Sequence, residues 1–430
     1  MSYRYEINDN KGWLLNMETS EYQESSIPKL FHGDILDENL KLVNSEIKNK
    51  KYHIGTFSTS QTQRFGKNKR GNIIYLIKPL ENKIPNFLIS YGGKLKGKLA
   101  VKFKFTNWEQ KLPSGEIIDV IGNFTDDNLE KILMYHYNIY SKKENIKEIQ
   151  VNPFESGIER KFYDANIFSI DPEDCQDVDD ALSLDYQNET KIIGVHIAQP
   201  TYWVTSDKIK SKIQEQFSTL YLKDSRKDLW GEKITNITSL LENCERPAYT
   251  ILYYFDNDDN LIKTEDFPSL IINKKKLSYE NANQFTDAKR LKEYTVKFTD
   301  ISDYHDVVSY WMLKTNTFIG NKLFSGKNNI PFRVNKVKNN SNDYLIQNLS
   351  EDIRKKFLSK NIESASYSLI ENHHEALGLD NYCHFTSPIR RIIDTWIHHY
   401  LTYPLSRENM TLDMDKINYF DQKTKKFHRE

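Results

Sequence analysis

Hydrophobic and polar residues follow different periods in different parts of this chain of 430 residues. Residues 52–124 contain short apolar runs, such as 72–78, and alternate Val or Phe with Lys over 101–105. Alternation with a period of two indicates β-strands. Glycine-containing turns such as 92–93 separate the runs. Many short strands joined by such turns predict a small barrel, and the OB fold is the common nucleic-acid-binding barrel of this size.

Helical periodicity is stronger after this region. Residues 125–150 and 303–323 repeat apolar positions every three to four residues, which predicts a helix in each. Residues 361–375 are predicted as a further helix. Ser387 and Pro388 suit the N-cap and first position of a helix that runs to residue 403. From about residue 155 onward we expect a mixture of strands and helices.

Positive charge is concentrated on the predicted barrel, although the whole chain has 60 basic and 60 acidic residues. Between Lys48 and Lys104 there are fourteen Lys and Arg residues and a single acid, Glu81. A basic segment of this kind is typical of nucleic-acid binding, but a solvated lysine-rich surface has the same composition. Candidates for contact with phosphates, or for stacking on a base, are Arg64, Phe65, Lys67, Lys102 and Lys104. Core packing is the alternative for Phe65.

Composition also argues against several classes of protein. No apolar run approaches the ~18 residues of a membrane span, and the N-terminus lacks the apolar region of a secretory signal. The three cysteines are far apart, with neither zinc-site spacing nor a disulfide framework. We therefore expect a cytoplasmic, monomeric protein that has no membrane partner.

The most distinctive segment is acidic. Six of the ten residues in 171–180 are Asp or Glu, and the apolar residues on either side predict buried strands. Crowded carboxylates repel each other and are costly to shield from water, so we expect a bound cation. Oxygen ligands favour Mg²⁺, with Mn²⁺ possible, and such ions suit phosphoryl chemistry. An EF-hand is excluded because its sixth and twelfth positions would be Gln176 and Leu182. A solvated acidic turn is the alternative.

A second candidate for chemistry is the sequence HFTSPIRR at 384–391. If a helix begins at Ser387, Arg390 and Arg391 lie in its first turn, where cations oppose the helix dipole. An arginine pair beside the amides of a helix N-terminus is suited to binding a phosphate. Asp394 is the alternative partner, and we expect it to neutralise Arg391 in part.

Three segments together resemble the RNB-domain exoribonucleases, the family of ribonuclease II, ribonuclease R and the catalytic exosome subunit. They are IDPEDCQDVDDAL at 170–182, VHIAQ at 195–199 and HFTSPIRR, in the family's order and spacing. The resemblance spans about residues 155–430. It implies an α+β protein in which small barrels of the OB or cold-shock type precede a mixed α/β RNB catalytic domain. The expected boundaries are 1–46 for at most a reduced first cold-shock barrel, 47–150 for the basic barrel and a joining helix, and 151–430 for the RNB domain.

The resemblance also implies an activity and the roles of individual residues. Such an enzyme hydrolyses single-stranded RNA with a free 3′ end, in the 3′-to-5′ direction, to nucleoside 5′-monophosphates, with Mg²⁺ as cofactor. By position, it implies metal binding by Asp171, Asp177 and Asp180, an essential role in cleavage for Asp179, contact of Arg390 with the scissile phosphate, and packing of Tyr221 against the last nucleotides. Arg391 is a further candidate for contact with RNA. A catalytically inactive RNB scaffold that binds RNA and regulates its translation or stability is the alternative.

Departures from the family pattern limit the resemblance. Gln199 stands where the family usually has Asp, so we expect the loss of a supporting carboxylate, and residues 216–217 are Gln-Phe where the family has Arg-Gly. We expect no C-terminal RNA-binding barrel after the RNB segment. With less basic surface, we expect weaker and more salt-sensitive retention of RNA.

Overall fold

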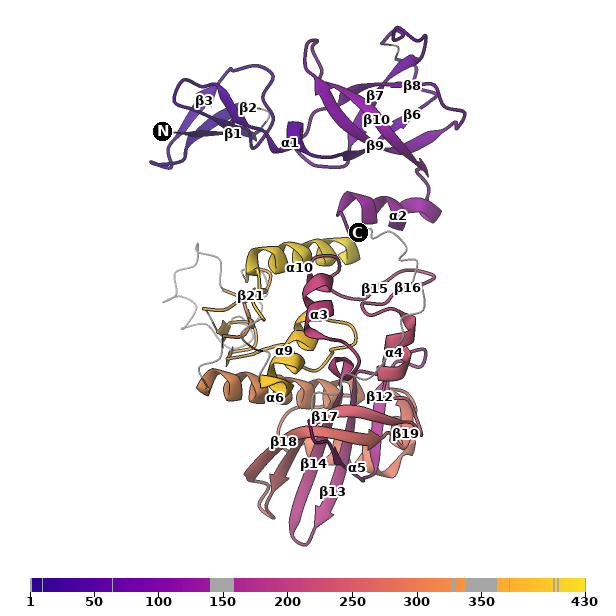
Figure 1. Cartoon of the computed structure of the whole chain (residues 1–430), viewed down its shortest axis with the longest axis vertical. Coiled ribbons are helices and arrows are strands. Elements are labelled where there is room, and N and C mark those ends of the chain that lie inside the picture. The colour runs from indigo at the N-terminus through magenta and orange to yellow at the C-terminus, as the bar shows by residue number, and fades with distance from the viewer. Residues whose placement is uncertain are drawn as a thin grey trace. The chain divides into compact units, whose positions relative to one another are not determined.

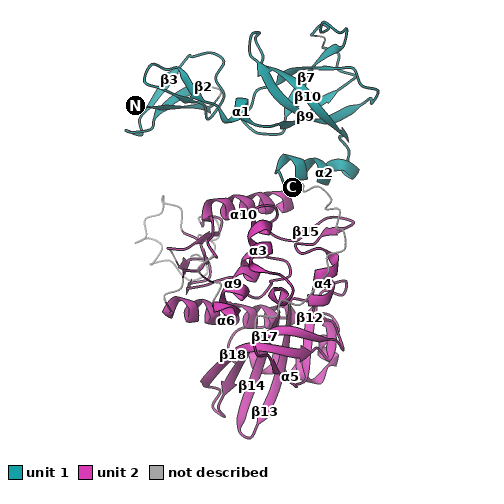
Figure 2. Cartoon of the chain, in the orientation of Figure 1, with its two compact units in different colours: residues 1–140, 430 teal, residues 141–429 magenta. Residues whose placement is uncertain are grey.

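The computed structural model describes residues 2–9, 11–63, 65–139, 158–326, 329–336, 362–370, 372–404, 407 and 410–429. Arg64 and the predicted helical residues 140–150 lie outside the described residues. The chain forms two compact units, one of residues 1–140 with 430 and one of residues 141–429 (Figure 2). Our expected domain boundaries stay a prediction, and each unit is considered by itself.

The first unit begins with an open five-stranded sheet in the order β3-β2-β1-β4-β5. Its strands are β1 (Tyr3–Asn8), β2 (Lys11–Asn16), β3 (Tyr22–Ser25), β4 (Ile35–Leu36) and β5 (Leu42–Asn44). Its small buried core consists of Tyr5, Leu14 and Leu36. Gly33 has φ +90°, a conformation that glycine adopts without strain, in the turn that leads into β4.

A closed barrel follows in the same unit, as predicted, with strands in the order β10-β8-β7-β6-β9 (Figure 1). They are β6 (His53–Ser58), β7 (Ile73–Pro79), β8 (Phe87–Tyr91), β9 (Lys98–Asn107) and β10 (Ser114–Asn123). Inward-facing residues such as Phe87, Val101 and Phe103 are fully buried in its core. The short helix α1 (Glu46–Asn49) precedes the barrel, and α2 (Asp126–His136) forms the described part of the predicted helix 125–150.

A seven-stranded sheet forms the centre of the second unit, in the order β11-β18-β17-β14-β13-β12-β19. Its strands are β11 (Lys161–Phe162), β12 (Ile167–Asp171), β13 (Asp180–Gln187), β14 (Thr190–Ala198), β17 (Glu245–Phe255), β18 (Leu261–Ile272) and β19 (Lys275–Ser278). Every residue of β12 is buried, as are Ala181 to Leu184 of β13. The acidic segment is therefore the connection between two buried, adjacent strands.

Helices pack against this sheet around one large apolar core that includes Trp311 and Trp396. They are α3 (Ser206–Ile213), α4 (Glu232–Thr238), α5 (Thr286–Thr295), α6 (Tyr304–Ser325), α9 (Ile392–Thr402) and α10 (Met414–Arg429), with the 3₁₀ turns η1 (Pro200–Tyr202) and η2 (Ala282–Gln284). The predicted helix 303–323 is confirmed: the Asp303 side chain caps α6 by accepting a hydrogen bond from the backbone of Asp306. None of the described helices has the length and apolar character to span a membrane.

The predicted helix 361–375 is wrong. Its described residues contain β21 (Ser366–Ser368), which pairs with β20 (Phe332–Val334), and β22 (His373–His374), which pairs with β23 (Leu379–Asp380). Tyr367 is buried between two half-exposed serines, which is the alternation of a strand, and its hydroxyl lies 2.7 Å from the Nδ1 atom of His384. Pairing of β21 with the distant β20, and of β22 with the nearby β23, has overridden a weak local helical preference.

Candidate active site

The acidic loop carries its carboxylates into the protein rather than into water. The exposed fractions of Asp171, Asp177 and Asp179 are 9%, 7% and 4%, whereas Glu173 and Asp174 are exposed. The solvated-turn alternative therefore does not describe the first three. Their burial follows from the strands on either side, because Asp171 ends β12 and Asp180 begins β13.

Two neighbouring segments fix the backbone of this loop. The Ser239 hydroxyl accepts a hydrogen bond from the Val178 amide and donates one to the Gln176 carbonyl, each at 2.9 Å. The Lys276 ammonium donates to the Cys175 carbonyl at 2.5 Å. These contacts stabilise the loop from α4 and β19, so its shape does not depend on the acidic residues alone.

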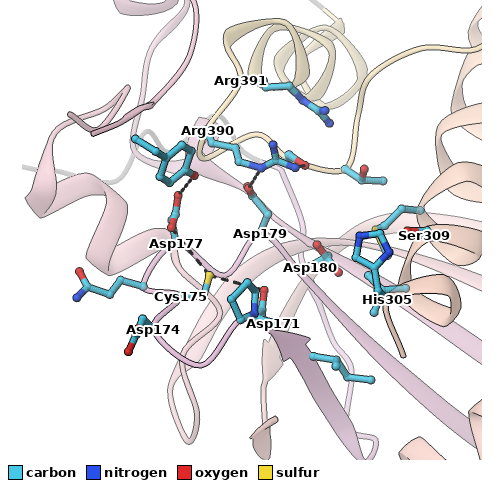
Figure 3. Close-up of a pocket in the computed structure, with 18 of the residues that line it drawn as sticks. Asp171, Asp174, Cys175, Asp177, Asp179, Asp180, His305, Ser309, Arg390 and Arg391 are labelled. Atoms are coloured by element: carbon cyan, nitrogen blue, oxygen red, sulfur yellow. Dashed lines mark hydrogen bonds and ion pairs between the residues drawn. The ribbon is translucent and has the colours of Figure 1, made fainter. Parts of the chain in front are cut away.

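Asp179 lies against the HFTSPIRR segment, as the resemblance implies. Its Oδ1 accepts a hydrogen bond of 2.7 Å from the Ile389 amide, and its Oδ2 lies 3.3 Å from Nε of Arg390 (Figure 3). The Arg390 guanidinium also donates to the Ser387 hydroxyl at 2.8 Å, while its side chain remains 44% exposed. One of its five N–H donors is thus engaged in a hydrogen bond, and others are available to a ligand.

The helix after this segment begins later than predicted. Helix α9 starts at Ile392 with Arg391 as its N-cap, whereas we expected Ser387 in that position. The reason is that Arg391 is extended, with φ −128° and ψ 127°, and forms a β-bridge with Ser218, while the Ile392 amide donates to the Phe217 carbonyl. Arg390 therefore belongs to a turn before the helix, and the dipole argument does not apply to it.

Arg391 differs from Arg390 in that its guanidinium already has a partner. Its Nε and Nη2 atoms donate to the two oxygens of the buried Asp394 at 2.9 and 2.8 Å. We expected Asp394 to neutralise Arg391 in part, and the structure shows a bidentate ion pair between them. Contact of Arg391 with RNA stays a prediction, although the residue lines the same cavity as Arg390.

A hairpin of β15 (Leu220–Tyr221) and β16 (Arg226–Lys227) covers another carboxylate of the loop. The Tyr221 hydroxyl donates to Oδ2 of Asp177 at 2.5 Å, and Nη1 of Arg226 lies 3.0 Å from its Oδ1. The Gln216 side chain donates to the carbonyls of Ser218 and Lys227 and so ties the hairpin together at its base. Sequence reasoning missed Arg226, because a two-residue strand leaves no periodic signal.

These elements enclose a cavity of about 1100 Å³. Its lining includes the acidic loop with Asp180, the hairpin, Tyr279, Arg390 and one face of α6 with His305 and Ser309 (Figure 3). The α6 residues were not predicted as site residues, since their helical stripe indicated only core packing. The cavity combines buried carboxylates with arginine donors, which suits a phosphate-bearing ligand and a cation.

Burial and mutual repulsion shift the acids of the loop. Burial raises the pKa of Asp171 to about 6, and burial together with the charge of Asp171 raises the pKa of Asp180 to about 8. Burial also raises the pKa of Asp179, although Arg390 opposes this shift. The Oδ2 atom of Asp171 is buried and accepts no hydrogen bond from any residue that the structure describes. Hard oxygen donors with unrelieved charge fit a divalent cation such as Mg²⁺.

The carboxylates frame the cavity without converging on one point. Among the described residues, three potential metal ligands come together at the start of α6. One side-chain ligand atom from each of Asp303, His305 and Asp306 lies within 4.8 Å of the other two. That group needs no ion, because Asp303 caps the helix and Asp306 accepts hydrogen bonds from Ser302. In the acidic loop, the Cys175 thiol lies between Asp171 and Asp177, at 3.7 and 3.9 Å from their oxygens (Figure 3).

Gln199 has a structural place. Its side chain is fully buried, accepts a hydrogen bond of 2.6 Å from Arg160 and donates one of 2.7 Å to the Thr402 hydroxyl. Its amide thus connects the end of β14 to the end of α9. The expected loss of a supporting carboxylate at this position stays a prediction.

The candidate RNA-binding residues of the barrel lie in the first unit. Phe65 is half-buried and Lys67 is exposed. The ammonium groups of Lys102 and Lys104 lie 3.4 Å from Asp119 and 3.0 Å from Glu116 on the adjacent strand, and that of Lys102 also lies 3.5 Å from the centre of the Tyr135 ring. Acids of β10 thus partly neutralise this face, and RNA binding there stays a prediction.

A mixed α/β domain with buried aspartates opposite an arginine, preceded by a small closed β-barrel, defines a class of protein organised like the RNB nucleases. The family model of the RNB domain matches residues 159–303 and 290–407, more than half of the chain, and the chain belongs to this family. The resemblance seen in the sequence is confirmed.

Curated relatives agree with this assignment. Ribonuclease R of Chlamydia muridarum is 24% identical over 441 residues, which cover 80% of this chain and 64% of that protein. Ribonuclease R of Aquifex aeolicus is 25% identical over 484 residues, covering 89% and 67%. The exosome complex exonuclease dis3 of Schizosaccharomyces pombe is 34% identical over 137 residues, covering 31% and 14%. The chain therefore spans less than two thirds of the length of the first of these relatives.

Solved structures have the same fold. Mycoplasma genitalium RNase R, in complex with ribose methylated single-stranded RNA, has a TM-score of 0.77 at 17% identity, covering 100% of this chain and 85% of that one. The yeast pseudonuclease Ssd1 has a TM-score of 0.70 at 14% identity, covering 99% and 71%. At these identities the likeness concerns the fold, and it confirms the predicted α+β class with a small barrel before the RNB domain.

Proposed function

We propose that this chain is a 3′-to-5′ hydrolytic exoribonuclease that degrades single-stranded RNA to nucleoside 5′-monophosphates and requires Mg²⁺. One observation carries the proposal: Asp179 lies against Arg390 at a cavity that Asp171, Asp177 and Asp180 also line. The residues to which the resemblance assigns cleavage thus lie at one cavity, although they are about 210 positions apart in the sequence.

Each group has a chemical task in this proposal. Asp171, Asp177 and Asp180 would hold Mg²⁺, which, when bound, supplies Lewis-acid stabilisation and activates water at a phosphodiester. Arg390 orients the scissile phosphate through its remaining N–H donors, since Asp179 and Ser387 fix the plane of its guanidinium. Asp179 is itself held by the Ile389 amide, so its carboxylate has a fixed direction toward the cavity.

The substrate class rests on relatives and on the cavity. Relatives of this chain are named ribonuclease R, and a structure of the same fold contains single-stranded RNA. Tyr221, 45% exposed, lines the cavity and offers a ring on which a terminal base can stack. We therefore propose a single strand with a free 3′ end as the substrate.

An inactive scaffold that binds RNA is the second candidate. The likeness to a pseudonuclease favours it, because one fold accommodates both nucleases and a protein without nuclease activity. The presence of all four aspartates and Arg390 around one cavity favours the enzyme.

The test compares 5′-labelled single-stranded RNA incubated with the native chain, Asp179→Asn and Glu173→Gln, with Mg²⁺ or with EDTA. Glu173 is the matched control, because it belongs to the same loop but is exposed. We expect progressive shortening by the native chain and Glu173→Gln with Mg²⁺ only, and bound but uncut RNA with Asp179→Asn. Binding without cleavage by the native chain would establish the scaffold, and equal degradation of single-stranded DNA would contradict the choice of RNA.

A further inference from the structure

The hairpin of β15 and β16 places the positively charged side chain of Arg226 beside the acidic loop. Tyr221 and Arg226 are opposite each other in its register. The Tyr221 hydroxyl donates a hydrogen bond to Oδ2 of Asp177 at 2.5 Å, and the Arg226 guanidinium donates one to Oδ1 at 3.0 Å. One hairpin therefore satisfies both oxygens of a carboxylate that is almost fully buried.

Asp228 holds the other edge of the same guanidinium. Its Oδ1 lies 2.7 Å from Nε of Arg226, and the side chains of Arg226 and Asp228 are 19% and 8% exposed. If Arg226 turned into solvent, it would leave both Asp177 and Asp228 buried and unpaired, which is costly. Its contact with Asp177 is therefore a built feature of the fold.

Charge in the acidic loop is neutralised unevenly. Arg226 pairs with Asp177 and Arg390 pairs with Asp179. None of the ion pairs between described residues involves Asp171 or Asp180, and Oδ2 of Asp171 is buried without a hydrogen bond from a described residue. A divalent cation entering this loop would meet two carboxylates that form no such ion pair, although the charges of Lys276 and Arg390 act on them, and one, Asp177, that is already paired.

We propose that Arg226 is a built-in counter-ion of Asp177 that competes with the divalent cation for this carboxylate and so sets the metal concentration at which the site fills. This inference rests on the metal site of the proposed function. A cation on Asp177 repels the adjacent guanidinium. Binding of the divalent cation at Asp177 therefore requires the Arg226 guanidinium to move away from Asp177. Asp228, which already pairs with Arg226, then remains as its counter-ion.

The test measures binding of Mn²⁺ to the full chain by the electron paramagnetic resonance signal of free Mn²⁺, without RNA. We expect Arg226→Met to tighten binding by about tenfold, within the range of typical coupling between two sites. Asp228→Asn should weaken binding, because Arg226 then serves Asp177 alone. Arg290→Met is the matched control: this arginine is 58% exposed on α5 and pairs with Asp287, so its loss should leave Mn²⁺ binding unchanged.

Thermal unfolding provides a second measurement. Without metal, Arg226→Met leaves the buried carboxylates of Asp177 and Asp228 without their basic partner, so the Tm of this variant should be lower than that of the native chain, and Mn²⁺ should raise its Tm by more than it raises that of the native chain. Arg226→Lys serves if Arg226→Met does not fold, since an ammonium lacks the fork that spans both acids. We expect an intermediate gain in affinity for that variant.

The opposite signs of the two substitutions distinguish competition from mere support of the loop. Unchanged or weaker Mn²⁺ binding in Arg226→Met and Arg226→Lys overturns the role of Arg226, while Mn²⁺ binding and RNA cleavage by the native chain would leave the proposed function standing. A native chain that neither binds Mn²⁺ nor cleaves RNA in a metal-dependent way overturns both.

Discussion

Removal of one partner from the buried ion pair between Arg391 and Asp394 should strongly destabilise the protein and disturb the site. Asp394 is fully buried and accepts three hydrogen bonds: two from the Arg391 guanidinium at 2.9 and 2.8 Å, and one from the Ser387 amide at 2.8 Å. It thus holds both ends of the turn that carries Arg390. Asp394→Ala removes both acceptor oxygens, and with them all three hydrogen bonds, and leaves the Arg391 charge buried without its partner.

The expected loss in the free energy of unfolding is about 3–5 kcal/mol, as for other buried pairs from which one partner is removed. That is a large part of the ~5–15 kcal/mol by which a domain is usually stable. The double variant Arg391→Met with Asp394→Ala should be less destabilised than Asp394→Ala alone, because no unpaired charge remains. Glu293→Ala is the control: its pair with Lys289 is exposed and should contribute at most about 1 kcal/mol.

Chemical denaturation of the four proteins, followed by circular dichroism, measures these differences, and RNA cleavage measures the site. We expect the double variant to recover stability but not cleavage, because the Ser387 amide still lacks its acceptor and the turn before α9 is no longer fixed. The reasoning would be refuted by a loss in Asp394→Ala no larger than that in Glu293→Ala, or by a double variant less stable than Asp394→Ala.

Three further predictions concern packing, pH and metal. Gly320→Ala places a Cβ 1.7 Å from the Asn381 carbonyl oxygen, so its free energy of unfolding should fall by about 1–3 kcal/mol in denaturation experiments. Burial lowers the pKa of His196 and His398 to about 3, so both side chains stay neutral in the folded state. Because the unfolded chain binds protons below pH 6.5, each histidine should lower the free energy of unfolding by about 2 kcal/mol at pH 5 relative to its value above pH 6.5. The free energy of unfolding of His398→Phe should therefore fall less steeply from pH 8 to pH 5 than that of the native chain. Because the pKa of Asp180 is raised to about 8, Mg²⁺ binding at pH 7 should release protons, which calorimetry in buffers of different ionisation enthalpy detects; no buffer dependence would contradict the raised pKa.

Sequence patterns identified the elements whose burial is periodic. The barrel strands and α6 followed directly from their alternation and their helical stripe, and the apolar residues beside the acidic loop correctly indicated that its aspartates are buried. The helix predicted at 361–375 failed because Tyr367 belongs to a strand whose partner, β20, is more than thirty residues away. The prediction that α9 begins at Ser387 failed because Arg391 forms a β-bridge with Ser218 and is therefore extended. In both cases a distant backbone decides the conformation, and a local pattern contains no information about it.

The candidate site was predictable in its composition but not in its pairing. The aspartates and Arg390 could be named from their motifs, whereas the pairing of Arg226 with Asp177 depends on a hairpin that no periodicity marks. Arg390 and Arg391 both line the cavity, but the Arg391 guanidinium is held by Asp394. The sequence predicted this neutralisation only in part, because the spacing of Arg391 and Asp394 does not show that packing brings both oxygens of the carboxylate onto one guanidinium.

The pairing pattern also indicates how the site forms. Asp177 depends on the hairpin, Asp179 depends on the turn at 387–391, and these two segments hold each other: the Thr219 amide donates to the Arg390 carbonyl at 2.9 Å. Three segments distant in sequence must therefore meet before the acids of the loop are paired. A metal ion alone cannot organise the loop locally, because the partners of Asp177 and Asp179 come from elsewhere in the chain. Formation of the site is consequently coupled to folding of the whole second unit, and substitutions that loosen the turn or the hairpin should weaken metal binding even where they touch no carboxylate.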